Sequence, residues 1–405
     1  MKEERKKVAN VPNLRFKGFT DNWEYITLGK CSSSLDYGMN ASAVKYDGKN
    51  RYIRITDIDE NTSKYKSENH VSPEGELHDK YLVKENDILF TRTGASTGKT
   101  YCYDIQDGKL YFAGFLIRAR INIIFFNAHF VFIQTQTAKY DKWVKLMSMR
   151  SGQPGINSQE YASYQFKIPS KIEQDKIALF FNKIDYRIQT QIKIIEDLKL
   201  LKKGISNRIF AKNLRFSNHN TNWKVIKLKE ILSIPEKIKA PSVDKNKLLT
   251  VKLHLKGVLK NENSDSLLEG ATNYFVRKKG QFIFGKQNLF NGAFGLIPDE
   301  LDGFLSSGDL PTLDINYEKV NSDYLIHFLG RANFYKKLED LASGSGSKRI
   351  HESTFLDSEI ILPDLKEQKK IVAILNQIDN KTNNELKMFR LLNTQKQCLL
   401  QNLFT

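Results

Sequence analysis

The sequence predicts an α+β protein made by tandem duplication: two globular units are each followed by a long helix, and the two helices pack as an antiparallel coiled coil. The first observation is that residues 168–210 return at 362–404 without a gap, at an offset of 194 residues and with 8 identical pairs in the first 18 positions. The second is that residues 14–30 return at 214–230, with 7 identical pairs in 17. The third is a heptad spacing of apolar residues in both long stretches.

The heptad seam favours pairing of the two long stretches within one chain. One seam position of the two copies holds Ile177, Ile184, Leu198 and Ile205, and then Ile371, Ile378, Leu392 and Leu399. Both seams break at matched polar positions, Gln191 with Glu385 and Lys202 with Lys396. A helix that packs on its own domain, or one that dimerises between chains, is the alternative. Since the first helix carries the chain to the second unit, a helix packed along it must run back, and a continuous pair roughly 65 Å long would set the distance between the units.

Within the first unit, short strands come before a helix and a last strand. The alternating or short apolar runs that predict strands are, in order, 52–56, 87–90, 109–121 and 164–168. Asn127 is a candidate N-cap for a helix that would carry apolar residues as far as Met147. Pro169 then marks the passage into the long helix, and the second unit is expected to repeat this order.

The charge favours a polyanionic partner. The chain has 63 Lys and Arg against 46 Asp and Glu, a formal net charge of +17, and nucleic acid is the commonest polyanion. Charge that serves solubility alone is the alternative. The three cysteines lie far apart without metal-ligand spacing, as is typical of reduced thiols in a cytoplasmic protein. The basic N-terminus lacks the apolar core of a secretion signal, and the apolar run 121–133 is too short to span a membrane.

A glycine-flanked loop in each unit offers polar side chains to a ligand. Residues 94–100, GASTGKT, come close to a phosphate-binding loop, but the two glycines enclose three residues where that motif has four. The equivalent stretch of the second unit has no Gly-Lys pair, so nucleotide hydrolysis is not predicted. The preferred interpretation is a loop that contacts phosphates or base edges, with a solvated hairpin as the alternative. Loop position and side-chain type give these candidate DNA-binding residues: Arg54, Thr56, Arg92, Thr93, Ser96, Lys99, Gln153, Lys252, Lys286, Gln287, Asn288, Asn291, Lys348 and Arg349.

The sequence shows no catalytic or metal-binding motif. The seven histidines form no paired metal ligands, and neither His-Glu-x-x-His nor a nucleophile elbow occurs. There is no Asn-Pro-Pro-aromatic motif of the kind that holds a flipped base for amino-methylation, and no glycine-rich cofactor turn. These absences indicate a protein that recognises a target without a cofactor, metal or catalytic residue of its own. The alternatives are a self-contained DNA methyltransferase or nuclease, and a coiled-coil scaffold that binds acidic proteins.

Three motifs occur twice and together indicate a family. They are LRF…W…L at the start of each unit, a Gly-Ser-rich run before each last strand, and I/L-P-x-x-x-E-Q…I…N…I-D at the start of each long helix. With these motifs the chain resembles, over nearly its whole length, the specificity subunit of type I restriction-modification systems. The resemblance implies an N-terminal tail, two target recognition domains and two conserved spacer helices, in the order 1–12, 13–167, 168–212, 213–361 and 362–405.

The resemblance also implies partners. Each recognition domain would read one half of a bipartite, asymmetric site in double-stranded DNA, while the subunit itself would not be an enzyme. Two copies of an adenine-specific modification methyltransferase would dock on the helices, and two copies of an ATP-dependent restriction subunit would join them. The partner-binding residues expected on the helices are Glu173, Gln174 and Asp185, with their counterparts Glu367, Gln368 and Asp379.

Overall fold

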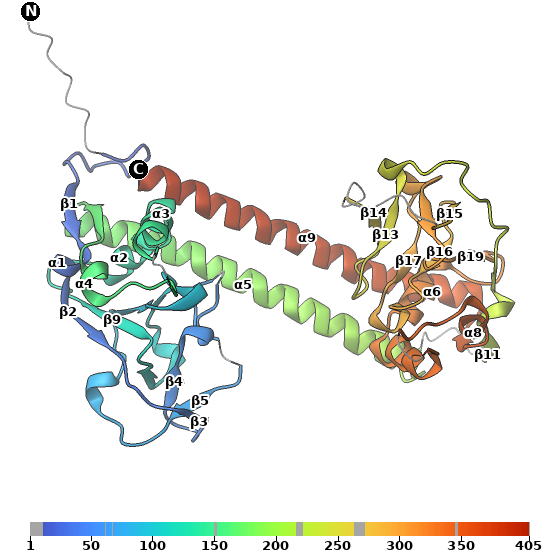
Figure 1. Ribbon diagram of the computed structural model, residues 1–405, viewed down its shortest axis with the longest axis horizontal. Coiled ribbons are helices and arrows are strands. Elements are labelled where there is room, and N and C mark those ends of the chain that lie inside the picture. The colour runs from blue at the N-terminus through green and yellow to red at the C-terminus, as the bar shows by residue number, and fades with distance from the viewer. Residues whose placement is uncertain are drawn as a thin grey trace, which may run out of the picture. The chain divides into compact units, whose positions relative to one another are not determined.

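The computed structural model describes residues 11–60, 62–66, 68–149, 152–215, 222–262, 272–344 and 347–404. It divides into two compact units, one made of residues 1–192 and 387–405 and the other of residues 193–386. Each unit therefore contains a globular domain together with parts of both long helices (Figure 1). The N-terminal tail expected at 1–12 lies almost entirely outside the described residues.

A four-stranded antiparallel sheet forms the centre of the first domain. Its strand order is β2-β9-β6-β7, with β2 at Ser32–Tyr37, β9 at Leu116–Ile121, β6 at Asp87–Thr91 and β7 at Thr100–Cys102. All five residues of β6 are buried, which confirms the buried strand predicted from the apolar run. Two-stranded sheets surround it: β1 (Glu24–Thr27) with β10 (Gln165–Ile168), β3 (Ala43–Lys45) with β5 (Val71–Pro73), and β4 (Arg51–Ile53) with β8 (Leu110–Phe112). The helices are α1 (Leu28–Cys31), α2 (Ala128–Gln134), α3 (Ala138–Met147) and α4 (Ser158–Ala162).

The second domain repeats the central sheet. Its strand order is β12-β19-β16-β17, with β12 at Leu232–Ser233, β19 at Thr312–Ile315, β16 at Phe282–Phe284 and β17 at Phe294–Leu296. Its two-stranded sheets are β11 (Lys224–Lys227) with β20 (Glu359–Leu362), β13 (Leu249–Val251) with β14 (Val258–Lys260), and β15 (Tyr274–Val276) with β18 (Leu305–Ser307). The helices are α6 (Ser322–Leu329), α7 (Ala332–Tyr335) and α8 (Glu352–Leu356). The central sheet and the pair formed by the first and last strands (β1 with β10, β11 with β20) are thus the duplicated scaffold, and the other two-stranded sheets are where the two domains differ.

Two long helices complete the units. Helix α5 spans Lys171–Phe210 and α9 spans Leu365–Leu403, so their first residues lie 194 positions apart, as in the sequence repeat. In the first unit Phe181 of α5 shares a core with Leu403 of α9. In the second unit Phe210 of α5 shares a core with Ile371 of α9. Because the start of each helix meets the end of the other, the pair is antiparallel, which confirms the predicted fold class (Figure 1).

One of the two polar breaks in the heptad seam, Lys202 with Lys396, is explained by ion pairs between the helices. Lys396 Nζ lies 2.6 Å from Asp185 Oδ1 in the first unit, and Lys202 Nζ lies 2.6 Å from Asp379 Oδ2 in the second. The two pairs are related by the repeat, since each lysine contacts the aspartate of the other copy. A lysine in each seam therefore has a specific partner on the opposite helix.

The predicted bounds of one strand and one helix in the first unit were wrong. The strand expected at 52–56 ends at Ile53, because Asp57 accepts hydrogen bonds from the backbone and side chain of Arg54 and turns 55–57 into a short 3₁₀ helix, η1. The helix expected after Asn127 is two helices, because Thr137 caps a second one. The first long helix begins at Lys171 because residues 165–168 pair with β1 and Pro169 disfavours the α conformation just before it. Among the described residues, no helix is both long enough and apolar enough to cross a membrane.

Candidate nucleic-acid interface

Three of the predicted residues, Arg54, Thr56 and Arg92, line one groove in the first unit. The groove has a volume of about 620 Å³ and lies beside the ends of β2, β4 and β8. Two exposed aromatic side chains also line it: Tyr37 is 43% exposed and Phe115 is 59% exposed. Cationic and aromatic side chains around a groove are the groups that hold phosphates, stack on bases and read base edges.

The Arg92 backbone is fixed while its guanidinium stays available. Its amide donates to Phe115 O at 3.0 Å, and its carbonyl accepts from Ile156 N at 2.9 Å. The guanidinium lies 4.9 Å from the centre of the Tyr37 ring, and among the described residues it has no carboxylate within ion-pair distance. The Tyr37 hydroxyl accepts from Ser158 N at 3.2 Å, and this bond and the Arg92 charge lower the pKa of Tyr37. The site therefore presents an oriented cation with no neutralising carboxylate.

Arg54 is held more firmly than Arg92. Its Nε and Nη2 donate to the two carboxylate oxygens of Asp57 at 2.8 and 2.9 Å, and this hydrogen bonding raises the pKa of Arg54. The Thr56 hydroxyl donates to the same carboxylate at 3.4 Å. Asp57 thus orients Arg54 and also neutralises part of its charge, so within this groove Arg92 is the stronger candidate for contact with an anionic ligand.

The loop that follows β6 is joined to the segment before α4. Gly94 N donates to Pro154 O at 2.9 Å, and a β-carbon at Gly94 would lie 3.1 Å from Gln153 Nε2. The structure therefore brings Thr93, Ser96 and Gln153 into one region, as η3 (Gly94–Ser96) forms the bend between them.

Lys99, a candidate DNA-binding residue, forms an ion pair within the chain. Its ammonium pairs with Glu60, and its side chain is only 22% exposed, because it reaches across to the loop that follows η1. The lysine that completes the near phosphate-loop motif is therefore neutralised within the chain.

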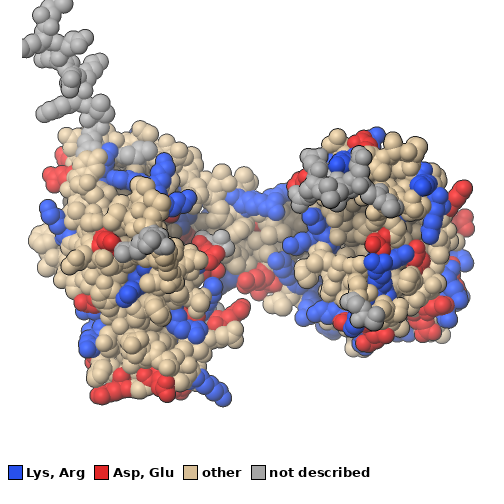
Figure 2. Space-filling view, in the orientation of Figure 1, with Lys and Arg blue, Asp and Glu red and all other residues tan. Residues whose placement is uncertain are grey.

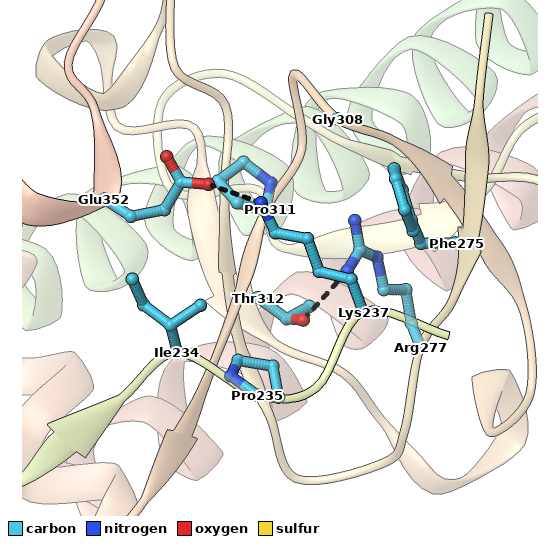
Figure 3. Close-up of a pocket in the computed structure, with 9 residues that line it drawn as sticks. All are labelled: Ile234, Pro235, Lys237, Phe275, Arg277, Gly308, Pro311, Thr312 and Glu352. Carbon is cyan, nitrogen blue, oxygen red and sulfur yellow. Dashed lines mark hydrogen bonds and ion pairs between the residues drawn. The ribbon is translucent and has the colours of Figure 1, made fainter. Parts of the chain in front are cut away.

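The second unit has a smaller, more enclosed pocket beside β15 and β18 (Figure 3). Its volume of about 20 Å³ is enough for a single water molecule. Like the groove of the first unit, it lies next to a glycine of the repeat, Gly308 here and Gly114 there. Lys286, the counterpart of Arg92, donates to Glu352 across 3.0 Å, and Lys237 lies 4.0 Å from the same carboxylate. The predicted cation of this unit is thus already paired.

Arg277 is a buried residue that lines this pocket. It is 4% exposed, and its guanidinium donates to Ser306 Oγ at 2.7 Å and Thr312 Oγ1 at 3.1 Å, with two further bonds to backbone carbonyls. Burial lowers the pKa of Arg277 to about 10. Burial alone would raise the pKa of Glu352, but bonds from its own backbone amide and from Lys286 outweigh that effect and lower it. The pocket is therefore a positively charged site with one ionised carboxylate.

Two predicted groups in the second unit lie in different places. One group contains Lys348, which pairs with Glu339 at 2.9 Å, and Arg349, which pairs with Asp309 at 3.2 Å. It lies beside Lys286, whose backbone carbonyl accepts a hydrogen bond from Ile350 N. Gln287 follows Lys286 in the same loop. The other group is Lys252 in the β13–β14 hairpin with Asn288 and Asn291 in the segment between β16 and β17, and the two segments meet where His254 N donates to Asn291 O at 2.9 Å. The candidate residues of this unit therefore lie in two separate groups, and their contact with DNA stays a prediction.

Four of the predicted partner-binding side chains are buried. Glu173 and Glu367 are each 1% exposed, and each accepts hydrogen bonds from the arginine that opens its own repeat, Arg15 or Arg215. Gln174 and Gln368 accept from the N-cap amides of α2 and α6, at 2.9 and 2.7 Å. These side chains fasten each long helix to its domain and are not exposed on the surface of the chain. Asp185 and Asp379 are partly exposed and form the ion pairs between the helices.

The chain matches a family model over both halves. Residues 21–200 and 220–388 match the model described as the type I restriction modification DNA specificity domain. The chain belongs to this family. As a specificity subunit of a type I restriction-modification system, its function is the recognition of DNA sequence.

Relatives of the specificity subunit agree with this assignment. It is 23% identical over 318 residues to the type I restriction enzyme MjaVIII specificity subunit of Methanocaldococcus jannaschii, covering 74% of this chain and 73% of that one. It is 25% identical over 323 residues to the putative MjaX specificity subunit of the same organism, with the same coverage. The crystal structure of the S subunit of a type I system from M. genitalium shares the fold, with a TM-score of 0.62, 14% identity and coverage of 98% and 99% of the two chains.

Sequence reasoning did not single out Tyr37, Phe115 and Arg277, which line the two candidate pockets of the specificity subunit. Aromatic residues are common in cores, so nothing in the sequence marks Tyr37 and Phe115 as exposed. Arg277 lies in a short charged run that is typical of a solvated turn, and only the fold buries it. Their roles depend on contacts between segments far apart in the chain.

Proposed function

We propose that the two domains of this specificity subunit each read one half of a bipartite, asymmetric DNA site. The observation that carries the proposal is that one scaffold, with the same central strand order and the same helix attachments, holds two different grooves. One groove is open and has, beside two aromatic rings, a guanidinium with no carboxylate partner among the described residues, while the other is narrow and is lined by a buried arginine. Different side chains at equivalent places in a repeated scaffold fit two different target sequences.

The subunit itself would direct chemistry that its partners perform. We place the first recognition domain at 13–167 and the second at 213–361, with the spacer helices at 168–212 and 362–405. Two modification methyltransferase subunits would methylate adenine at the recognised site, and two ATP-dependent restriction subunits would cut unmodified DNA, in the cytoplasm. No catalytic residue of the specificity subunit is required for this division of labour.

An exposed apolar stripe on α5 supports docking of a modification subunit on the helices. Ile172, Leu179 and Tyr186 recur at heptad spacing, and they are 75%, 57% and 74% exposed. Apolar residues at this spacing on a solvent face suit a further helix packed alongside. If so, Leu179→Asp should abolish copurification with the methyltransferase while leaving the thermal unfolding of the subunit unchanged. Undiminished copurification would place the docking surface elsewhere.

Exchange of one domain tests the bipartite reading. Residues 13–167 would be replaced by the corresponding domain of another specificity subunit, and the chimera would be expressed with its methyltransferase. Sequencing of methylated adenines in the host should show one half of the site changed and the other half retained. A folded, active chimera that altered both halves would refute the two-reader model.

A further inference from the structure

A second, larger groove in the second unit lies between the end of α5 and the globular domain. Its volume is about 810 Å³. Lys199, Lys203 and Asn207 of α5 form one wall, and the tip of the β13–β14 hairpin and the α6–α7 junction form the other. Figure 2 shows Lys and Arg side chains gathered where the helices meet the second domain. This groove is separate from the pocket around Arg277, with which it shares no lining residue.

The groove has more basic groups than the chain neutralises. Lys199 and Lys203 are exposed, and among the described residues neither has a carboxylate within ion-pair distance. Only Lys202 is paired, through Asp379. The lining contains four basic side chains and only two carboxylates, Asp323 and Asp379. The basic side chains are Lys199, Lys202, Lys203 and Arg331.

Arg331 is oriented by aromatic rings. Its guanidinium lies 4.4 Å from the centre of the Phe210 ring and 4.0 Å from that of Phe328, and Nε donates to Phe328 O at 3.0 Å. Burial lowers the pKa of Arg331 to about 10, which leaves the group charged at neutral pH. Stacking holds a guanidinium in place without neutralising it, so its remaining N–H groups can serve a ligand.

The repeat shows that the fold does not need these charges. At the offset of 194, Lys199, Lys203 and Arg331 correspond to Asn393, Gln397 and Thr137 in the first unit, all of them neutral. By contrast, Lys202 corresponds to Lys396, and both have ion pairs between the helices. The paired lysine therefore belongs to the shared scaffold, while the three unpaired cations are particular to the second unit.

Backbone hydrogen bonds hold the opposite wall of the groove. His254 and Leu255 at the hairpin tip both have a φ of 59°, a left-handed conformation that is strained for residues other than glycine. Hydrogen bonds from their amides to Asn291 O and Gly292 O, each 2.9 Å, hold them there. Strained backbone that is held by its surroundings is frequent at binding sites. The same hairpin carries the exposed Lys252.

We propose that this groove of the second unit binds the phosphate backbone of DNA, as a contact that is independent of base sequence. Lysine, arginine and amide donors with no anionic partner are the groups that bind phosphate oxygens. The proposal rests on the DNA recognition of the family but not on the base-reading roles of the two smaller sites. An acidic segment of a partner protein would satisfy similar charges, but the specificity subunit already has a polyanion as its target.

Neutralising two lysines tests the proposal. The variant is Lys199→Gln with Lys203→Gln, and the matched control is Lys193→Gln with Lys387→Gln, two exposed helix lysines related by the repeat that do not line the groove. The protein, assembled with its methyltransferase, would be titrated with a duplex that carries the methylated site and with a scrambled duplex, at several salt concentrations. The groove variant should bind both duplexes more weakly, by the same factor. The slope of log affinity against log salt concentration should become shallower by roughly 2, as expected when two phosphate contacts are lost. The control should leave the slope nearly unchanged.

Three outcomes would overturn the proposal. Equal losses of DNA affinity in the groove variant and in the control would show a long-range charge effect only. Unchanged binding in a groove variant with unaltered thermal unfolding would show that the groove does not meet DNA. Unchanged DNA affinity together with loss of a subunit on copurification would show that an acidic protein segment occupies it. The methylated sequence should stay the same in the groove variant, so failure here is distinguishable from failure of the base-reading sites, which would change that sequence.

Discussion

Arg92→Ala should weaken recognition of the half-site that the first domain reads. The change removes a guanidinium that contacts the Tyr37 ring at 4.9 Å and has no carboxylate partner among the described residues. Its backbone bonds to Phe115 and Ile156 are independent of the side chain, so the loop should keep its shape. The cost to folding is then the loss of one cation–π contact, about 0.5–1 kcal/mol, and of one long hydrogen bond from Nη1 to Gly114 O at 3.5 Å.

The expected cost to binding is larger. If the Arg92 guanidinium donates two hydrogen bonds to a base edge, its loss costs about 1–3 kcal/mol of discrimination between the correct and a wrong base. This is roughly a 5- to 150-fold loss of affinity for the correct site. Arg92→Lys separates the two kinds of contact, because lysine keeps the charge but lacks the planar fork. Base reading predicts that the lysine variant behaves like the alanine variant, whereas a phosphate contact predicts that it stays near the wild type.

The assay combines equilibrium binding with sequencing of methylated adenines. Binding of the assembled complex to the methylated site and to single-base variants would be measured by fluorescence anisotropy. Lys286→Ala is the contrasting variant: its ammonium is held by Glu352, which is 12% exposed on its side chain, so its removal should lower stability more than it lowers specificity. Unchanged affinity and an unchanged methylated sequence in a folded Arg92→Ala protein would refute the assignment.

Three further predictions concern stability. Arg15→Met leaves the buried carboxylate of Glu173 without its guanidinium and should destabilise the protein by about 3–5 kcal/mol in thermal melts; a shift below 1 kcal/mol would contradict this. Lys202→Glu should be partly rescued by Asp379→Lys, with a coupling of about 0.5–1 kcal/mol in urea unfolding, and no coupling would argue against the pair. Burial lowers the pKa of His129 from 6.5 to about 4. The neutral His129 therefore contributes to the free energy of unfolding above pH 6.5, and this contribution is lost as the pH falls toward 4. His129→Leu should remove up to about 3 kcal/mol of that loss, and an identical pH profile in the variant would exclude the role.

The sequence by itself determined the duplicated plan. The repeat at 194 residues predicted two helices with one pattern, and apolar periodicity can do this because the seam of a long helix is read from local spacing alone. The buried strand β6 and the N-cap at Asn127 were predictable for the same reason, since each depends on neighbours in the chain. The family resemblance rested on motifs that the structure shows to be attachment points, such as the glutamate and glutamine at the start of each helix.

Only the tertiary structure decided which of those residues are available. Glu173 lies on a helix with a charged face, and its sequence context is that of an exposed residue; its burial follows from Arg15, which lies 158 positions away. Arg92 and Lys286 are equivalent in sequence, yet one is free of carboxylates and the other is paired, because Glu352 arrives from a distant helix. Charge neutralisation depends on contacts between remote segments, and such contacts have no signature in local spacing. For the same reason the groove beside Lys199 and Lys203 became visible only when α5 was folded against the second domain.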